Sequence, residues 1–267
     1  MDVARPASLE IGIMGDVVVT ARGARVTEFE STATLAMLCR LAVDVGRPIR
    51  RDDLAELLWP GRPAGRALGN LRHSLTVLRR VIDDDHRHPF IDAVGCALVL
   101  NADRVRVDLA EFRRLVVRRS SATTDDLRRA YALRRGPMLA GLDGTLNPDF
   151  DHWLTGQRVD MNAEFAALLD RLTAISARLE APGDVIPLVR EWIECDPWNE
   201  RAHARLVRLL ALEGHSVAAI EHARQFVDDL SEQFGLQPDA DLRAAIDDVR
   251  WGRVVPPVDE STIPALW

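Results

Sequence analysis

The residues with the clearest chemical meaning lie between positions 66 and 80, in the stretch RALGNLRHSLTVLRR. Apolar residues recur there at alternating steps of three and four, which places them on one side of an α-helix. These are Leu68, Leu71, Leu75, Leu78 and Ile82. Since successive residues of a helix are rotated by about 100°, the opposite side of this helix and its flanks present a different set of residues. It consists of Arg66, Gly69, Asn70, His73, Val77 and Arg80, with Arg72, Thr76 and Arg79 on the flanks.

Arg, Asn, His and Thr are the residue types that contact phosphates and base edges when a helix lies in the major groove of DNA. The surrounding charge favours this interpretation over a surface helix that carries arginines by chance. The whole chain has a net charge of −7, yet residues 46–80 hold eight arginines against three acids. A local basic patch on an acidic protein indicates a polyanionic partner. We therefore add Arg50 and Arg51 to the predicted phosphate contacts.

The elements around this helix predict a winged helix. Strand-like stretches at 9–13, 17–20 and 25–26 predict a small antiparallel sheet, and helical patterns follow at 31–45 and in DLAELLW, where Asp52 or Asp53 is a candidate cap. After the basic helix, short strands are expected at 90–92, 97–100 and 105–108. Three helices followed by a β-hairpin place the third helix in the major groove and the hairpin on the adjacent backbone. Arg104 and Arg106 are then wing contacts, or alternatively solvated strand arginines or partners of the second domain.

Residues beyond 108 are expected to be entirely helical. Asp108 and Glu111 have the spacing of a capping box, and helical patterns cover 109–119, 124–135, 148–180, 184–195, 199–213, 216–233 and 239–250. The stretch from Leu179 has a counterpart about 33 residues later, from Leu212. A period near 34 is typical of tetratricopeptide-like helix pairs, and an ordinary helical bundle is the alternative. The predicted domains are 1–108 (winged helix, α+β), 109–250 (all-α helical repeats) and 251–267 (tail), giving a mainly α protein.

Enzyme chemistry finds little support in these residues. All 34 basic residues are arginine, which excludes a P-loop lysine, a Schiff-base lysine and a lysine general base. The three cysteines are scattered and odd in number, which argues against a disulfide framework or a zinc site. His86 and His88 lack a third fixed ligand. We expect no enzyme activity, no cofactor, no metal, no membrane segment and a cytoplasmic location.

Several motifs together resemble a known family. They are LAMLCRLAVDVGRPIRRDDLAELLWP, LGNLRHSLTVLRRVI, GCALVLNADRVRVDLAEF, RGPMLAGLD and the stretch from CDPWNE to LRAAI. In this order they are similar to bacterial transcriptional activators of the antibiotic regulatory protein (SARP) class. In that class a response-regulator-type winged helix is fused to a tetratricopeptide-like bacterial transcriptional activator domain. Two departures are Gly69 within the recognition helix and GCAL, where an aromatic residue usually precedes the wing leucine.

The resemblance implies a regulator that binds direct repeats near promoters in double-stranded DNA and recruits RNA polymerase. A homodimer is compatible with it, and no membrane partner is expected. On this sequence the candidates for base or phosphate contact are the outward residues of 66–80. The alternative is a protein-interaction scaffold that uses the helical repeats without productive DNA binding. The two hypotheses differ in whether the arginine face of residues 66–80 is exposed.

Overall fold

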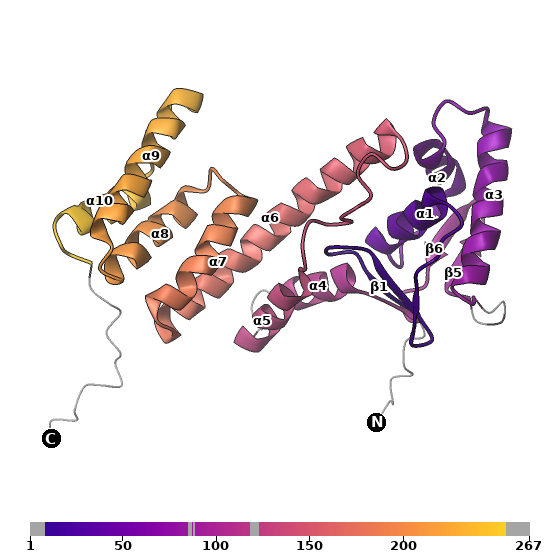
Figure 1. The fold of residues 1–267 in the computed structure, drawn as a ribbon, viewed down its shortest axis with the longest axis horizontal. Coiled ribbons are helices and arrows are strands. Elements are labelled where there is room, and N and C mark those ends of the chain that lie inside the picture. The colour runs from indigo at the N-terminus through magenta and orange to yellow at the C-terminus, as the bar shows by residue number, and fades with distance from the viewer. Residues whose placement is uncertain (1–8, 85–86, 88, 118–122, 255–267) are drawn as a thin grey trace, which may run out of the picture. The chain divides into compact units, whose positions relative to one another are not determined.

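The computed structural model describes residues 9–84, 87, 89–117 and 123–254. Contacts divide the chain into two compact units, Met1–Met161 and Asn162–Trp267 (Figure 1). This division falls further along the chain than the domain boundary that we expected at residue 108. The boundary at 108 stays a prediction. Two parts of the sequence analysis lie outside the described residues. They are the histidines considered as metal ligands, His86 and His88, and residues 255–267 of the expected tail.

The first unit opens with a four-stranded sheet in the order β3-β2-β1-β7. Strands β1 (Leu9–Gly12), β2 (Val18–Ala21) and β3 (Ala24–Val26) form the expected antiparallel meander, and β7 (Val105–Val107) joins β1 in parallel. The prediction that residues 105–108 continue the wing is therefore wrong. Leu9 lies opposite Val105 and Ile11 opposite Val107, and all four side chains are buried. Burial of these side chains on one face favours this register.

A winged helix follows within the same unit. Helix α1 (Thr32–Val43), strand β4 (Ile49–Arg50), helices α2 (Arg51–Leu58) and α3 (Ala64–Val81), and strands β5 (Ile91–Val94) and β6 (Ala97–Leu100) appear in this order. The three strands form a second sheet, β4-β6-β5, in which β5 and β6 are the wing hairpin. Helix α2 begins one residue before the expected caps: Arg50 occupies the N-cap without a side-chain bond, and Asp52 and Asp53 lie in the first turn.

Asp108 opens helix α4 (Asp108–Val117) but does not form the predicted capping box. Its carboxylate accepts hydrogen bonds from the backbone N–H of Ile13 at 2.9 Å and of Met14 at 3.0 Å, and from the guanidinium of Arg135 at 2.8 Å. Glu111 is bound by Arg114 at 2.9 Å, and this hydrogen bond lowers the pKa of the Glu111 carboxyl. Asp108 thus joins the end of β1 to the residues that follow helix α5 (Thr124–Leu133).

The remaining helices agree closely with the expected segments. Helix α6 (Pro148–Leu179) begins in the first unit and ends in the second, which contains α7 (Pro182–Cys195), α8 (Glu200–Leu212), α9 (Ser216–Phe234) and α10 (Ala240–Arg250). Helices α6 and α8 end at Leu179 and Leu212, each one residue before the expected end. In the second unit α8 packs against α7, α9 and α10 around an apolar core (Figure 1). The mainly α fold class is confirmed.

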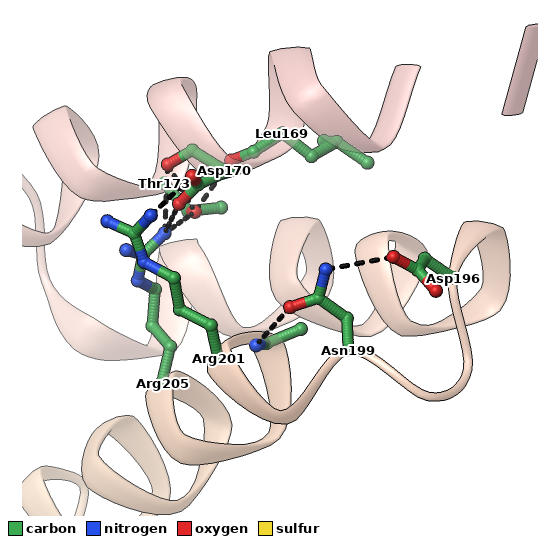
Figure 2. Close-up of polar contacts among 8 residues, drawn as sticks. Leu169, Asp170, Thr173, Asp196, Asn199, Arg201 and Arg205 are labelled. Carbon is green, nitrogen blue, oxygen red and sulfur yellow. Dashed lines mark hydrogen bonds and ion pairs between the residues drawn. The ribbon is translucent and has the colours of Figure 1, made fainter. Parts of the chain in front are cut away.

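Polar contacts fix the start of α8 (Figure 2). The Asn199 side chain accepts from the backbone N–H of Ala202 at 3.2 Å and thereby caps the helix. Arg201 in the first turn and Arg205 one turn further both bind the Asp170 carboxylate on α6, at 2.9 Å and 3.1 Å. Within the described part of the chain, no helix has an apolar stretch of the length that crossing a bilayer requires.

Candidate nucleic-acid interface

Helix α3 is amphipathic, as the residue spacing predicts, but its buried side is wider than the predicted apolar stripe. The buried side chains are Ala67, Leu71, Ser74, Leu75, Val77 and Leu78. Val77, which helical geometry places on the outward side, is only 4% exposed. Its burial is a correction to the sequence analysis, since the angle of a residue about the helix axis does not show which neighbouring element covers it.

The N-terminal part of the outward side is exposed. Arg66, Asn70 and His73 succeed one another at steps of four and three, so they form one stripe along α3. All three are exposed, and none of them makes a hydrogen bond or ion pair with a described residue through its side chain. These are a guanidinium, an amide and an imidazole, and the first two match guanine and adenine edges. The predicted arginine face is thus accessible here.

Arg72 and Thr76 flank this stripe and bond to their own helix. The Arg72 side chain donates through Nε to the Leu68 carbonyl at 3.2 Å, and Thr76 donates through Oγ1 to the Arg72 carbonyl at 3.0 Å. Both residues are exposed. Because a guanidinium has five N–H donors, Arg72 retains donors for a phosphate.

The C-terminal end of α3 is occupied by contacts with the chain itself. Arg79 donates to the Ile91 carbonyl on β5 at 2.8 Å, lies 3.5 Å from the Asp84 carboxylate, and has a side chain only 28% exposed. Arg80 is paired with Glu30, although its side chain remains exposed. Arg79 therefore joins α3 to the wing hairpin instead of lying on the exposed stripe, which sequence spacing alone did not reveal.

Arg50 and Arg51 lie at the start of α2, close to the wing. Arg50 is exposed and pairs with Asp52 at 3.3 Å. Arg51 is half-buried, its Nε has no hydrogen-bond partner, and with Arg72 and Cys96 it lines a hollow of about 370 Å³ beside α3. This hollow brings the end of the wing hairpin to the same side as the recognition helix.

Arg104 and Arg106 do not lie on the wing hairpin. Arg104 follows β6 in the turn before β7, with its guanidinium 5.5 Å from the centre of the Phe90 ring. Arg106 lies on β7 in the N-terminal sheet, 3.8 Å from the Glu10 carboxylate. Their placement on the wing is a correction, and the physical reason is that β7 pairs with β1.

One residue that the sequence analysis passed over belongs to this surface. Arg62 is exposed immediately before α3, and its side chain contacts no described polar group. Pro63 occupies the N-cap of α3 without a side-chain bond, and the Arg66 N–H donates to the Pro63 carbonyl at 2.8 Å. The N–H groups of Ala64 and Gly65 make no hydrogen bond with a described residue. A helix N-terminus binds anions, and Arg62 and Arg66 flank it. The local charge of residues 46–80 was the signal that could have identified Arg62.

The described residues offer little for catalysis or metal binding. Among them no three His, Cys, Asp or Glu side chains are grouped as metal ligands would be. Burial raises the pKa of the Cys39 thiol to about 12, so this thiol stays protonated and is a poor nucleophile. The arrangement on α3 is instead one of exposed hydrogen-bond donors.

Comparison with known proteins identifies the family. The model of the bacterial transcriptional activator domain matches residues 107–250, more than half of the chain. Among curated protein sequences, none is significantly similar. The solved structure of Mycobacterium tuberculosis EmbR in complex with a low-affinity phosphopeptide is similar in fold, with a TM-score of 0.64 at 20% sequence identity. The similarity covers 94% of this chain and 66% of EmbR, so the chain spans less than two thirds of that protein. The expected resemblance to the SARP class is confirmed, and the chain belongs to the bacterial transcriptional activator domain family, a family of transcriptional regulators.

Proposed function

We propose that this regulator binds specific DNA sequences through α3, occupies direct repeats near promoters and activates transcription by recruiting RNA polymerase. Arg66, Asn70 and His73 read base edges in this proposal. The phosphate contacts come from Arg50, Arg51, Arg62 and Arg72, with Thr76 and Arg80 at the edge of the interface. Arg104 and Arg106 make at most peripheral contacts, and Arg79 acts by holding the hairpin.

The observation that carries the proposal is the exposed stripe at the N-terminal part of α3. If these exposed polar side chains served to stabilise the fold, we would expect them to form hydrogen bonds or ion pairs with neighbouring residues. Arg66, Asn70 and His73 instead hold no intramolecular partner among the described residues. They lie beside open helix N–H groups on a locally basic segment of an acidic chain. This combination fits a polyanionic ligand whose sequence is read from the groove.

The test is selection of duplexes from a random pool by the purified full chain, followed by binding across a salt series. We expect an enriched repeat and an affinity that falls with salt, with a slope of about −0.9 per phosphate contact. Asn70→Ala should reduce discrimination at one base position by ~1–3 kcal/mol. Arg66→Ala should abolish site preference while the far-ultraviolet circular dichroism stays unchanged. Arg224→Ala on α9, also an exposed arginine, is the matched control and should bind like the parent chain.

Unchanged sequence preference in both α3 variants would refute the assignment of this helix. An absence of DNA binding even at low salt would favour the alternative, a protein-interaction scaffold. Recruitment of RNA polymerase is tested separately, by adding purified polymerase to the DNA complex and measuring whether the two proteins occupy the promoter cooperatively.

A further inference from the structure

The second unit contains a basic groove that DNA recognition by α3 does not use. It has a volume of about 690 Å³ and is lined by residues of α6, α8 and α10 and by the residues that follow α10. Five arginines and two aspartates supply its charged groups. The arginines are Arg178, Arg201, Arg205, Arg208 and Arg253. On a chain whose net charge is −7, this excess of positive charge is local.

The arginine at the base of the groove is held in place by its neighbours. Arg205 donates to the Asp170 carboxylate at 3.1 Å and to the Thr173 hydroxyl at 2.6 Å (Figure 2). Its guanidinium lies 5.1 Å from the centre of the Trp192 ring, and the side chain is only 15% exposed. Arg205 is therefore held in place at the base of the groove, paired with the Asp170 carboxylate.

The outer arginines retain donors for a ligand. Arg201 binds Asp170 through one terminal nitrogen, at 2.9 Å, and Arg208 binds Asp241 through one terminal nitrogen, at 2.7 Å. Each guanidinium has five N–H donors, so both can donate to a further carboxylate. Arg178 is exposed and makes no hydrogen bond or ion pair with a described residue. The pKa of the Asp241 carboxyl is lowered by its hydrogen bond with Arg208 and by nearby Arg201 and Arg205, consistent with a positive field in the groove.

Apolar side chains lie between these charges. Ala174 and Ala177 of α6 and Leu209 and Leu212 of α8 also line the groove. Nucleic-acid single strands are bound by stacking bases on aromatic side chains, and among the described residues no aromatic side chain lines this groove. Arginines combined with aliphatic side chains fit a peptide that carries both carboxylates and apolar residues.

We propose that this groove binds an acidic segment of a partner protein. Carboxylates of the segment pair with Arg178, Arg201 and Arg208. Its apolar side chains contact Leu212 and the partly exposed Ala174 and Ala177. Because the site is separate from α3, this interaction does not require DNA binding.

The experiment uses the full chain and a fluorescein-labelled short peptide of glutamates interspersed with leucines, followed by fluorescence anisotropy. Its counterpart with glutamine in place of glutamate is the peptide control. The test variants are Arg178→Gln and the double variant Arg178→Gln/Arg201→Gln. The matched control is Arg243→Gln, an exposed arginine of α10 that does not line the groove. Arg178→Gln breaks no hydrogen bond or ion pair with a described residue, so it keeps the test valid if the double variant is unstable.

We expect saturable binding of the glutamate peptide that weakens with salt, and none of the glutamine peptide. Loss of one exposed ion pair should reduce the affinity up to about fivefold for Arg178→Gln, and loss of two should reduce it up to about thirtyfold for the double variant. Equal binding to the parent chain and Arg178→Gln, or an absence of binding at low salt, would overturn the proposal. A single-stranded oligonucleotide that binds in place of the peptide and is lost in Arg178→Gln would overturn it in favour of nucleic acid. DNA selection through α3 is measured independently, so failure of one proposal is distinguishable from failure of the other.

Discussion

A pair of histidines between α8 and α9 makes the stability of the second unit depend on pH. His203 is 5% exposed, and its Nδ1 lies 3.0 Å from Nε2 of His222. Its Nε2 lies 3.0 Å from the Pro197 carbonyl, and its ring stacks on Phe226 with centroids 3.7 Å apart. The carbonyl can only accept, so Nε2 of His203 carries the hydrogen and Nδ1 accepts from His222. A second proton on His203 would break this arrangement.

The structure gives the size of the effect. Burial is the main cause that lowers the pKa of His203 from 6.5 to about 4, and burial also lowers the pKa of His222. Between the ordinary pKa of 6.5 and the lowered pKa of about 4, His203 binds more protons in the unfolded chain than in the folded chain. The free energy of unfolding therefore falls as the pH is lowered through this range. From pH 7 to pH 5 the loss due to His203 is about 2 kcal/mol by proton linkage.

The assay is urea unfolding of the full chain at pH 7 and at pH 5, followed by tryptophan fluorescence. Trp198, whose ring is 4.7 Å from that of Phe234, reports on this unit. His203→Gln should lower stability at pH 7 and reduce the difference between the two pH values by about 2 kcal/mol. His215→Gln, at an exposed histidine before α9, is the control and should keep the parent difference. If His203→Gln retains the full difference, the reasoning is refuted.

Two further substitutions test the first unit. Gly69 has open space where a Cβ would lie, so Gly69→Ala should raise the free energy of unfolding by ~1 kcal/mol through helix propensity, measured by urea denaturation; an unchanged or lower midpoint would contradict this. A fall in DNA affinity in the same variant would show that Gly69 allows close backbone approach. Asp108→Ala leaves the N–H groups of Ile13 and Met14 without their acceptor and should cost about 1–3 kcal/mol. Asp103→Ala, at an exposed turn, is its control, and equal stability of the two variants would argue against the role of Asp108.

Local sequence signals predicted the helices well. Glycine, proline and helical periodicity act through neighbours close in the chain. This is why α6 and α8 end at Leu179 and Leu212, within one residue of the predicted ends at 180 and 213. The exposed stripe of Arg66, Asn70 and His73 also follows from helical spacing. Whether these side chains contact DNA stays a prediction.

Contacts between distant segments were not predictable in this way. Strand β7 was assigned to the wing because it follows β6 directly, yet its buried valines pair with β1, far away in the sequence. Asp108 has the spacing of a helix cap and instead binds the end of that same strand. Spacing cannot distinguish these roles, since pairing partners and acceptors are chosen by packing in three dimensions.

The sequence by itself determined the element order, the family resemblance and the helix that carries the DNA-binding candidates, because each depends on local periodicity or on ordered motifs. Only the tertiary structure decided that Val77 is buried and that Arg79 holds the hairpin, because neighbouring elements cover that end of α3. It also decided that arginines from α6, α8 and the residues after α10 line one groove. Such a grouping arises from packing between helices, which residue spacing within one helix does not specify.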